Sequence, residues 1–142
     1  MTGGERVFVA LGSNLGDRAR WLAAARDRLA ALPETRVVQE SRIEETAPLG
    51  PVPQGPYLNQ MVELDTALEP PALLSACLNI EAELGRERTV RWGPRPIDLD
   101  IVRYGDRTVD TPALTIPHPE LRHRPFWQRE LAELEAAVRT HA

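Results

Sequence analysis

The sequence predicts an α+β fold built on an antiparallel sheet, and the order and periodicity of its segments predict it. Strand and helix patterns succeed one another as strand, helix, strand, strand, helix, strand, with short connections and no internal repeats. The chain has 142 residues, of which 42% are hydrophobic, and this suits one compact core. We therefore expect a single domain over residues 1–142.

A buried strand and an amphipathic helix open the chain. Residues 7–11 form an uninterrupted apolar run typical of a buried strand, and the Gly-Ser-Asn sequence at 12–14 ends it. Asp17 is placed as the N-cap of a helix that continues until Pro33 stops it. The apolar stripe that should face the sheet consists of Trp21, Leu22, Ala25, Leu29 and Leu32.

Two further strands and a stiff loop follow this helix. Residues 36–45 are predicted as the second strand, and the proline- and glycine-rich residues 46–56 as the loop. Residues 57–66 alternate in polarity, which predicts a third strand that is buried on one side only. Its core face would carry Leu58, Val62 and Leu64, and its open face Asn59, Met61, Glu63 and Asp65.

The second half of the chain repeats the pattern. Residues 70–85 are predicted as a helix that starts at two prolines and stops at a glycine. Residues 97–102 form a fourth strand, a short strand is expected near 107–110, and apolar residues at helical spacing predict a last helix over 127–140.

The whole order matches the ferredoxin-like split βαβ arrangement (βαββαβ), in which both helices pack on one face of a four-stranded antiparallel sheet. Here a short extra strand and a C-terminal helix are added. The uncovered sheet face and its loops would then be available to a ligand. Because one fold hosts many functions, the chemistry has to be read from particular residues.

Composition excludes several classes of protein. All 17 basic residues are arginine. Without lysine there can be no Walker A loop, Schiff-base enzyme or lysine-dependent kinase site. Any phosphate would therefore be held by arginine and metal. No apolar run approaches the roughly 20 residues of a membrane-spanning helix, and the N-terminus lacks the apolar region of a secretory signal.

Charge and cysteine content narrow the possible partners. The net charge of -4 argues against a protein that coats nucleic acid, although residues 86–129 carry more arginines than acids. Cys77 is the only cysteine, so an intrachain disulfide is impossible and a reducing compartment is indicated. We expect a cytoplasmic monomer that engages neither nucleic acid nor membrane.

The strongest local motif is RWGPRPIDLDIV at 91–102. In a strand, Asp98 and Asp100 project on the same side while Leu99 and Ile101 enter the core. Two adjacent carboxylates repel each other unless a cation lies between them, and hard oxygen ligands suit Mg²⁺ that carries substrate phosphates. The alternative interpretation is a solvent-facing pair on an edge strand.

Arginines cluster immediately before this pair. They are Arg86, Arg88, Arg91 and Arg95. Planar guanidinium groups beside a metal pair are suited to a polyphosphate and to a transferring group. Trp92 could pack on a base or serve as an apolar plug under the loop, and His118 could donate to phosphate or be a hydrogen-bonded structural residue.

Several stretches in this chain resemble one enzyme family. They are ALGSNLGDR (10–18), TAPLGP (46–51), YLNQMV (57–62), IEAELGR (80–86), RWGPRPIDLDI (91–101) and PHPELRHRPF (117–126). In this order they resemble the 6-hydroxymethyl-7,8-dihydropterin pyrophosphokinases of folate biosynthesis, and they span nearly the whole chain. The chain departs from the family pattern at Leu78, where a glutamine is common, and after Phe126, where a Pro-Leu continuation is missing.

The resemblance implies transfer of the β,γ-diphosphate of ATP to the hydroxymethyl group of the reduced pterin, leaving AMP. Asp98 and Asp100 would hold two Mg²⁺ ions, and Arg86 and Arg95 would stabilise the transferring group. The residues implied for ATP are Glu81, Arg88, Trp92, His118 and Arg124. The residues implied for the pterin are Thr46, Leu49, Tyr57, Asn59 and Phe126, with the two aromatic rings as a clamp.

A noncatalytic ferredoxin-like module that binds a nucleotide or a partner through its open sheet face is the alternative function. Such a module would not require Asp98 and Asp100 beside Arg95. Their joint presence favours the enzyme.

Overall fold

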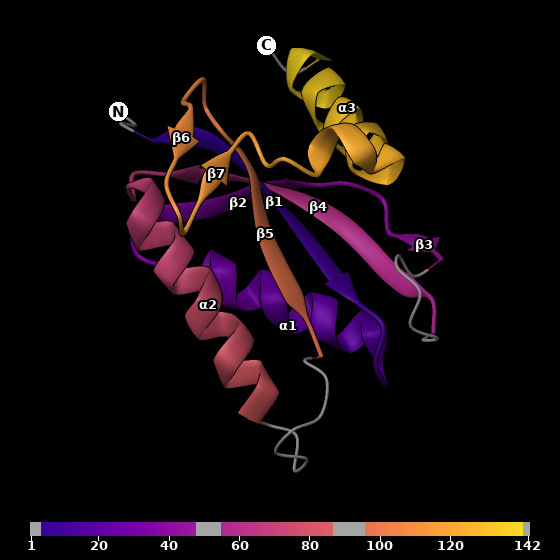
Figure 1. Cartoon of the computed structure of the whole chain (residues 1–142). Coiled ribbons are helices and arrows are strands. Elements are labelled where there is room, and N and C mark those ends of the chain that lie inside the picture. The colour runs from indigo at the N-terminus through magenta and orange to yellow at the C-terminus, as the bar shows by residue number, and fades with distance from the viewer. Residues whose placement is uncertain (1–3, 48–54, 87–95, 141–142) are drawn as a thin grey trace.

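The structure is a computed structural model that describes residues 4–47, 55–86 and 96–140. In this part of the chain the main sheet contains β1 (Glu5–Ser13), β2 (Thr35–Glu40), β3 (Glu44–Thr46), β4 (Tyr57–Thr66) and β5 (Asp98–Tyr104). The helices are α1 (Arg18–Ala30), α2 (Pro70–Arg86), the short 3-10 helix η1 (Leu121–His123) and α3 (Pro125–Thr140). A separate two-stranded sheet pairs β6 (Val109–Asp110) with β7 (Thr115–Ile116). Figure 1 shows the arrangement.

The strand order is β2-β4-β1-β5, and β3 also pairs with β4. Every pairing in the main sheet is antiparallel. The two central strands are therefore the first and third predicted strands, as the split βαβ arrangement requires. The predicted fold is confirmed. Among the described residues, none of the helices combines the length and apolar character needed to span a bilayer.

The predicted second strand is interrupted. Residues 36–45 were expected as one strand, but they divide into β2 and β3, both beside β4. Ser41 lies at the break, where its hydroxyl accepts the Met61 amide at 2.9 Å and its carbonyl accepts the Gln60 side chain at 2.7 Å. These bonds hold the chain on β4 across the break, so two short strands replace one long one.

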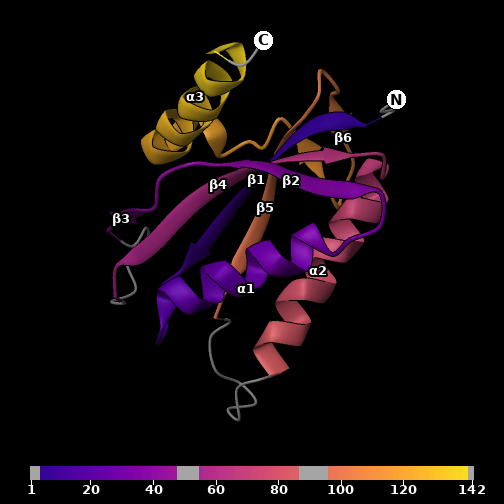
Figure 2. The ribbon, with the colours of Figure 1, turned by 180° about the vertical axis from the view of Figure 1, so that it is seen from behind.

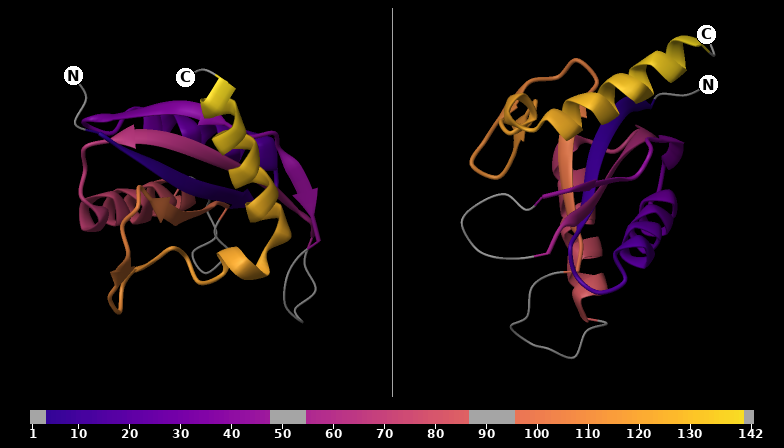
Figure 3. Two further views of the ribbon diagram at one scale, coloured as in Figure 1. Left: turned by 90° about the horizontal axis from the view of Figure 1, so that it is seen from above. Right: turned by 90° about the vertical axis from the view of Figure 1, so that its right-hand side faces the viewer.

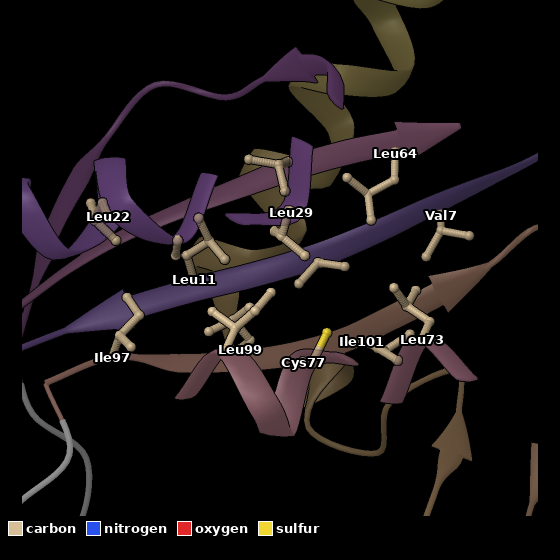
Figure 4. Close-up of a cluster of buried hydrophobic side chains, with 14 of the residues drawn as sticks. Val7, Leu11, Leu22, Leu29, Leu64, Leu73, Cys77, Ile97, Leu99 and Ile101 are labelled. Atoms are coloured by element: carbon tan, nitrogen blue, oxygen red, sulfur yellow. The ribbon is translucent and has the colours of Figure 1, made fainter. Parts of the chain in front are cut away.

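The first hydrophobic core lies between the sheet and the pair α1 and α2, on one face of the sheet (Figures 1 and 2). Asp17 is the N-cap of α1, because its side chain accepts the Arg20 amide at 3.2 Å. Leu22 and Leu29 are fully buried and share this core with Leu11 and Leu99 of the strands (Figure 4). The predicted apolar stripe is thus confirmed.

The opposite face is less open than predicted. Helix α3 crosses it, away from α1 and α2 (Figure 3). A second cluster of buried residues joins this helix to the sheet: Phe8, Ala10, Met61, Val102, Phe126, Trp127, Leu131 and Leu134. The expectation that residues 57–66 are buried on one side only is therefore wrong, since α3 covers Met61 and its neighbours. A smaller open area remains where α3 begins.

The predicted stop at Gly85 also moves slightly, because α2 includes this glycine and extends to Arg86. No left-handed backbone conformation occurs at Gly85, so the glycine does not form the expected C-terminal cap. The effect is to carry the helix one residue further toward the segment that precedes β5.

Candidate active site

A pocket of about 440 Å³ opens beside the ends of β1, β4 and β5. Residues from β1, β3, β4 and β5, from α2 and from around the start of α3 surround it. The lining consists of Ala10, Leu11, Gly12, Thr46, Ala47, Tyr57, Asn59, Leu74, Leu78, Glu81, Asp98, Leu99, Asp100, Arg124, Phe126 and Trp127. Its size is within the range of small-molecule sites.

Gly12 occupies the middle of the pocket floor. It pairs with Asn59 of β4 on one side and with Asp98 of β5 on the other. Directly paired residues point to the same face of a sheet, so the amide and the carboxylate flank the glycine. A Cβ atom at Gly12 would lie 3.3 Å from Asn59 Oδ1 and 3.6 Å from the Tyr57 ring. The missing side chain therefore leaves room between the two polar groups.

Asp98 and Asp100 project from β5 to the α3 side of the sheet, since Leu99 and Ile101 belong to the opposite core. Both aspartates are half-buried and line the pocket. This is the orientation predicted from their spacing. Between them, the Leu99 amide donates to Glu81 Oε2 at 2.7 Å. Glu81 of α2, only 6% exposed, thereby holds the outer edge of β5 in place.

His118 lies beside Asp100, with 3.7 Å between Nε2 and Asp100 Oδ1. Its Nδ1 accepts the Glu120 amide at 3.0 Å, so the proton of a neutral ring is on Nε2, the nitrogen nearer to Asp100. The backbone amide of His118 donates to Val102 of β5 at 2.9 Å. The ring also packs edge-on against Trp127, with 5.0 Å between the centroids. These contacts fix the imidazole next to the carboxylate pair.

Arg124 brings a positive charge to the same pocket. Its guanidinium carbon lies 4.5 Å from the Trp127 ring centre, which is a cation–π geometry. Its buried Nε lies 3.7 Å from Glu120 Oε1. Trp127 therefore supports both the arginine and the histidine, although the sequence indicated only a helix-core position for it.

The other end of the pocket has amide, hydroxyl and aromatic groups. Asn59 Nδ2 donates to Thr46 Oγ1 at 2.5 Å, which joins β4 to β3. Tyr57 follows the same alternation as Asn59 and lines the pocket, and Phe126 does so from the start of α3. Stacking faces with a fixed amide are the groups that a flat heterocycle with ring nitrogens requires.

The structure thus brings together Thr46, Tyr57, Asn59, Glu81, Asp98, Asp100, Arg124 and Phe126, with His118 adjacent. The other expected residues cannot be placed. Leu49, Arg88, Trp92 and Arg95 lie outside the described residues, and so does the side chain of Arg86. The predicted site residues did not include Leu74 or the exposed Leu78 of α2, although Leu78 is one of the departures from the family pattern named above. Helical spacing alone does not distinguish such pocket residues from core residues.

Two further observations limit the chemistry. Among the described residues, no three His, Cys, Asp or Glu side chains form a metal-binding group. A pair of carboxylates is a donor set for a hard cation that takes its remaining ligands from phosphate and water, as Mg²⁺ does.

Cys77 lies in the core under the site, and burial, followed by the charges of Glu81 and Asp100, raises its pKa to about 12. It is therefore no nucleophile at neutral pH.

Comparison with known proteins identifies the family. The model of the 7,8-dihydro-6-hydroxymethylpterin-pyrophosphokinase family matches residues 8–136, which include every residue of the pocket. The chain belongs to this family.

Curated relatives agree over nearly the whole chain. A 2-amino-4-hydroxy-6-hydroxymethyldihydropteridine pyrophosphokinase of Pseudomonas aeruginosa is 44% identical over 135 residues, or 95% of this chain and 83% of that protein. Proteins of the same name from Methylorubrum extorquens and Bacillus subtilis are 46% and 42% identical, over 91% and 96% of this chain and 82% and 81% of theirs. The family resemblance inferred from the sequence motifs is confirmed.

Proposed function

We propose that this chain transfers the β,γ-diphosphate of ATP to the hydroxymethyl group of 6-hydroxymethyl-7,8-dihydropterin. The observation that carries the proposal is the joint position of Asp98, Asp100, Asn59 and Phe126 around one pocket in a member of this family. In the balanced reaction, the hydroxymethyl oxygen attacks the β-phosphorus of ATP. The bond from that phosphorus to the α,β-bridging oxygen breaks, AMP leaves, and the hydroxyl proton is released.

The carboxylate pair supports a magnesium-dependent reaction. Asp98 and Asp100 are the residues that would hold Mg²⁺, two ions in our proposal, and the metal would neutralise charge on the polyphosphate. Glu81 accepts the Leu99 amide between the two aspartates and so anchors this part of β5 to α2. Reactions of this type depend mainly on positioning and electrostatics, so a stiff β5 directly benefits the transfer.

Other described residues divide between the two substrates. Arg124 and His118 supply donors on the side of the carboxylates and would contact ATP, together with Glu81. Thr46, Tyr57, Asn59 and Phe126 form the other end and would hold the pterin. From the sequence motifs we also assign Arg88 and Trp92 to ATP, Arg86 and Arg95 to the transferring group, and Leu49 to the pterin.

The direct test is incubation of the protein with ATP, Mg²⁺ and the hydroxymethyl dihydropterin. We expect AMP and diphosphorylated pterin in equal amounts, and neither product when EDTA replaces Mg²⁺. Formation of ADP would show transfer of the γ-phosphate alone and contradict the proposed reaction. ATP binding without either product would instead support a noncatalytic nucleotide-binding module.

A further inference from the structure

The pterin end of the pocket is bordered by two elements, α3 and β3, which meet at a distance from the two aspartates. Phe126 comes from the start of α3. Thr46 comes from β3, and its hydroxyl accepts the Asn59 side chain. Among the described strands, β3 has only three residues and pairs with β4 alone, whereas α3 lies on the sheet through the second apolar cluster. The shape of this end therefore depends on what holds α3 against β3.

A pair of glutamates lies between these two elements. Glu130 of α3 is 1% exposed, and both of its carboxyl oxygens are buried. Oε2 of Glu44 on β3 is buried as well. In the described part of the chain, no N–H group or hydroxyl donates to any of these three oxygens. A hydrogen bond between the two carboxyl groups is possible only if one of them carries a proton.

The surrounding charges decide which of the two glutamates carries the proton. Arg129 contacts Glu44 Oε1 at 3.1 Å through Nε and at 3.0 Å through Nη2, so Glu44 has a cationic partner. The other charged groups near the pair are Arg42, from the segment between β2 and β3, and Glu133 of α3, and these two pair with each other. On β4, the residue opposite Glu44 is the uncharged Asn59. Glu130 is therefore the member that should be neutral.

The same geometry shifts the pKa values of the two carboxyl groups in opposite directions. Burial, followed by the hydrogen bond and the charge of Glu44, raises the pKa of Glu130 to about 9. Although burial opposes the change, the bond from Glu130 and the contact with Arg129 lower the pKa of Glu44. One shared proton thus joins one carboxyl oxygen of Glu130 to Glu44 across the helix–strand contact.

We propose that Glu130 and Glu44 are positioning residues for the pterin substrate: neutral Glu130 donates its hydroxyl to Glu44 and so holds α3, with Phe126, on β3, with Thr46. The proposal rests on the proposed function for the identity of the ligand. Loss of the proton places two negative charges in a buried contact, which separates α3 from β3. Phe126 and Thr46 border the pterin end directly, whereas α3 reaches the ATP side only through Trp127, which supports His118 and Arg124, so pterin binding should be affected more than ATP binding.

The experiment compares the wild type with Glu130→Gln, whose amide donates to Glu44 at any pH. Binding of the hydroxymethyl dihydropterin is measured by calorimetry at pH 7 and pH 9.5, with Mg²⁺ and a nonhydrolysable ATP analogue present. Half a unit above a pKa of about 9, roughly a quarter of the molecules keep the proton. The wild-type Kd for the pterin should therefore rise roughly fourfold more than that of Glu130→Gln.

Comparison at equal pH cancels any titration of the pterin itself. Glu135→Gln is the matched control, because Glu135 lies on the same helix but pairs with Arg103. It should keep the wild-type pH dependence. Glu130→Ala should weaken pterin binding already at pH 7. Equal pH dependence in the wild type and Glu130→Gln would overturn the proposal.

Urea unfolding gives a readout that needs no substrate. The folded protein keeps the Glu130 proton up to about pH 9, whereas an unfolded chain releases it near pH 4.5. The free energy of unfolding of the wild type should therefore fall as pH rises through this window, and that of Glu130→Gln should fall less. If the wild type neither binds the pterin nor forms AMP at pH 7, the proposed function fails. The urea midpoints then still decide whether the glutamate pair holds α3 on β3.

Discussion

The two faces of the central sheet use the same strands in opposite ways. On the α1 and α2 side, β1 contributes Val7, Val9 and Leu11 to an apolar core. On the α3 side, the intervening positions of β1 are Phe8, Ala10 and Gly12, which lead from a small apolar cluster to the pocket floor. Alternation thus lets one strand stabilise the fold with one set of side chains and build a site with the other. Substitutions on the two faces should therefore have separable effects.

The largest expected effect is on the core face. Leu29 of α1 is fully buried, so Leu29→Ala should lower the free energy of unfolding by about 3 to 5 kcal/mol. Urea denaturation measures the change. Val38→Ala on β2 is the control, because this side chain is 39% exposed and its loss should change stability little. Equal destabilisation by both variants would contradict the assignment of the main core.

On the site face, Asp98→Ala or Asp100→Ala should reduce turnover at least about 10²-fold, or about 2.7 kcal/mol, while the urea midpoint stays near that of the wild type. The reason is that each removes a carboxylate that faces the pocket without supporting the core. Single-turnover rates at saturating Mg²⁺ test this. Asp110→Ala, at an exposed position in β6, should keep full activity. Near-wild-type turnover in either variant would contradict the assignment of Asp98 and Asp100 as metal ligands.

Asn59→Ala should weaken pterin binding about tenfold, because the variant loses both an amide toward the pocket and the bond that holds Thr46. Affinity for the ATP analogue should change less. Titration calorimetry with each ligand separates the two effects. The control is Asn79→Ala, an exposed asparagine of α2 that does not line the pocket. An equal loss for both ligands would show that the two ends of the pocket are not distinct.

The smallest effect should come from Arg18, which joins the two sides of the proline-rich loop. Its guanidinium donates to the Pro56 carbonyl at 2.9 Å and lies 2.9 Å from Glu45 Oε2. These are partly exposed contacts, so Arg18→Ala should raise the KM for the pterin only about threefold. Steady-state kinetics measure it, with Arg36→Ala as the control for an exposed ion pair elsewhere. An unchanged KM for the pterin would remove any role of this contact in the site.

Local patterns in the sequence were sufficient for most elements. Asp17 caps its helix in the way its residue type and position predict, and Asp98 and Asp100 share a face because strand geometry allows nothing else. The order of the elements also predicted the sheet topology. The family resemblance added residues such as Asn59 and Phe126, which the structure brings to the pocket.

Only the tertiary structure decided how distant segments meet. Helical spacing predicted α3 but not which surface it would cover, because an apolar stripe on a helix does not specify which other apolar surface it packs against. Once α3 lies over β4, Met61 is buried and the open face shrinks to the region around the pocket. In the same way, Glu130 and Glu44 are ordinary surface-type residues in the sequence. Packing between positions 86 residues apart buries Glu130 beside the half-buried Glu44, because burial and charge depend on every neighbour in space rather than on neighbours along the chain.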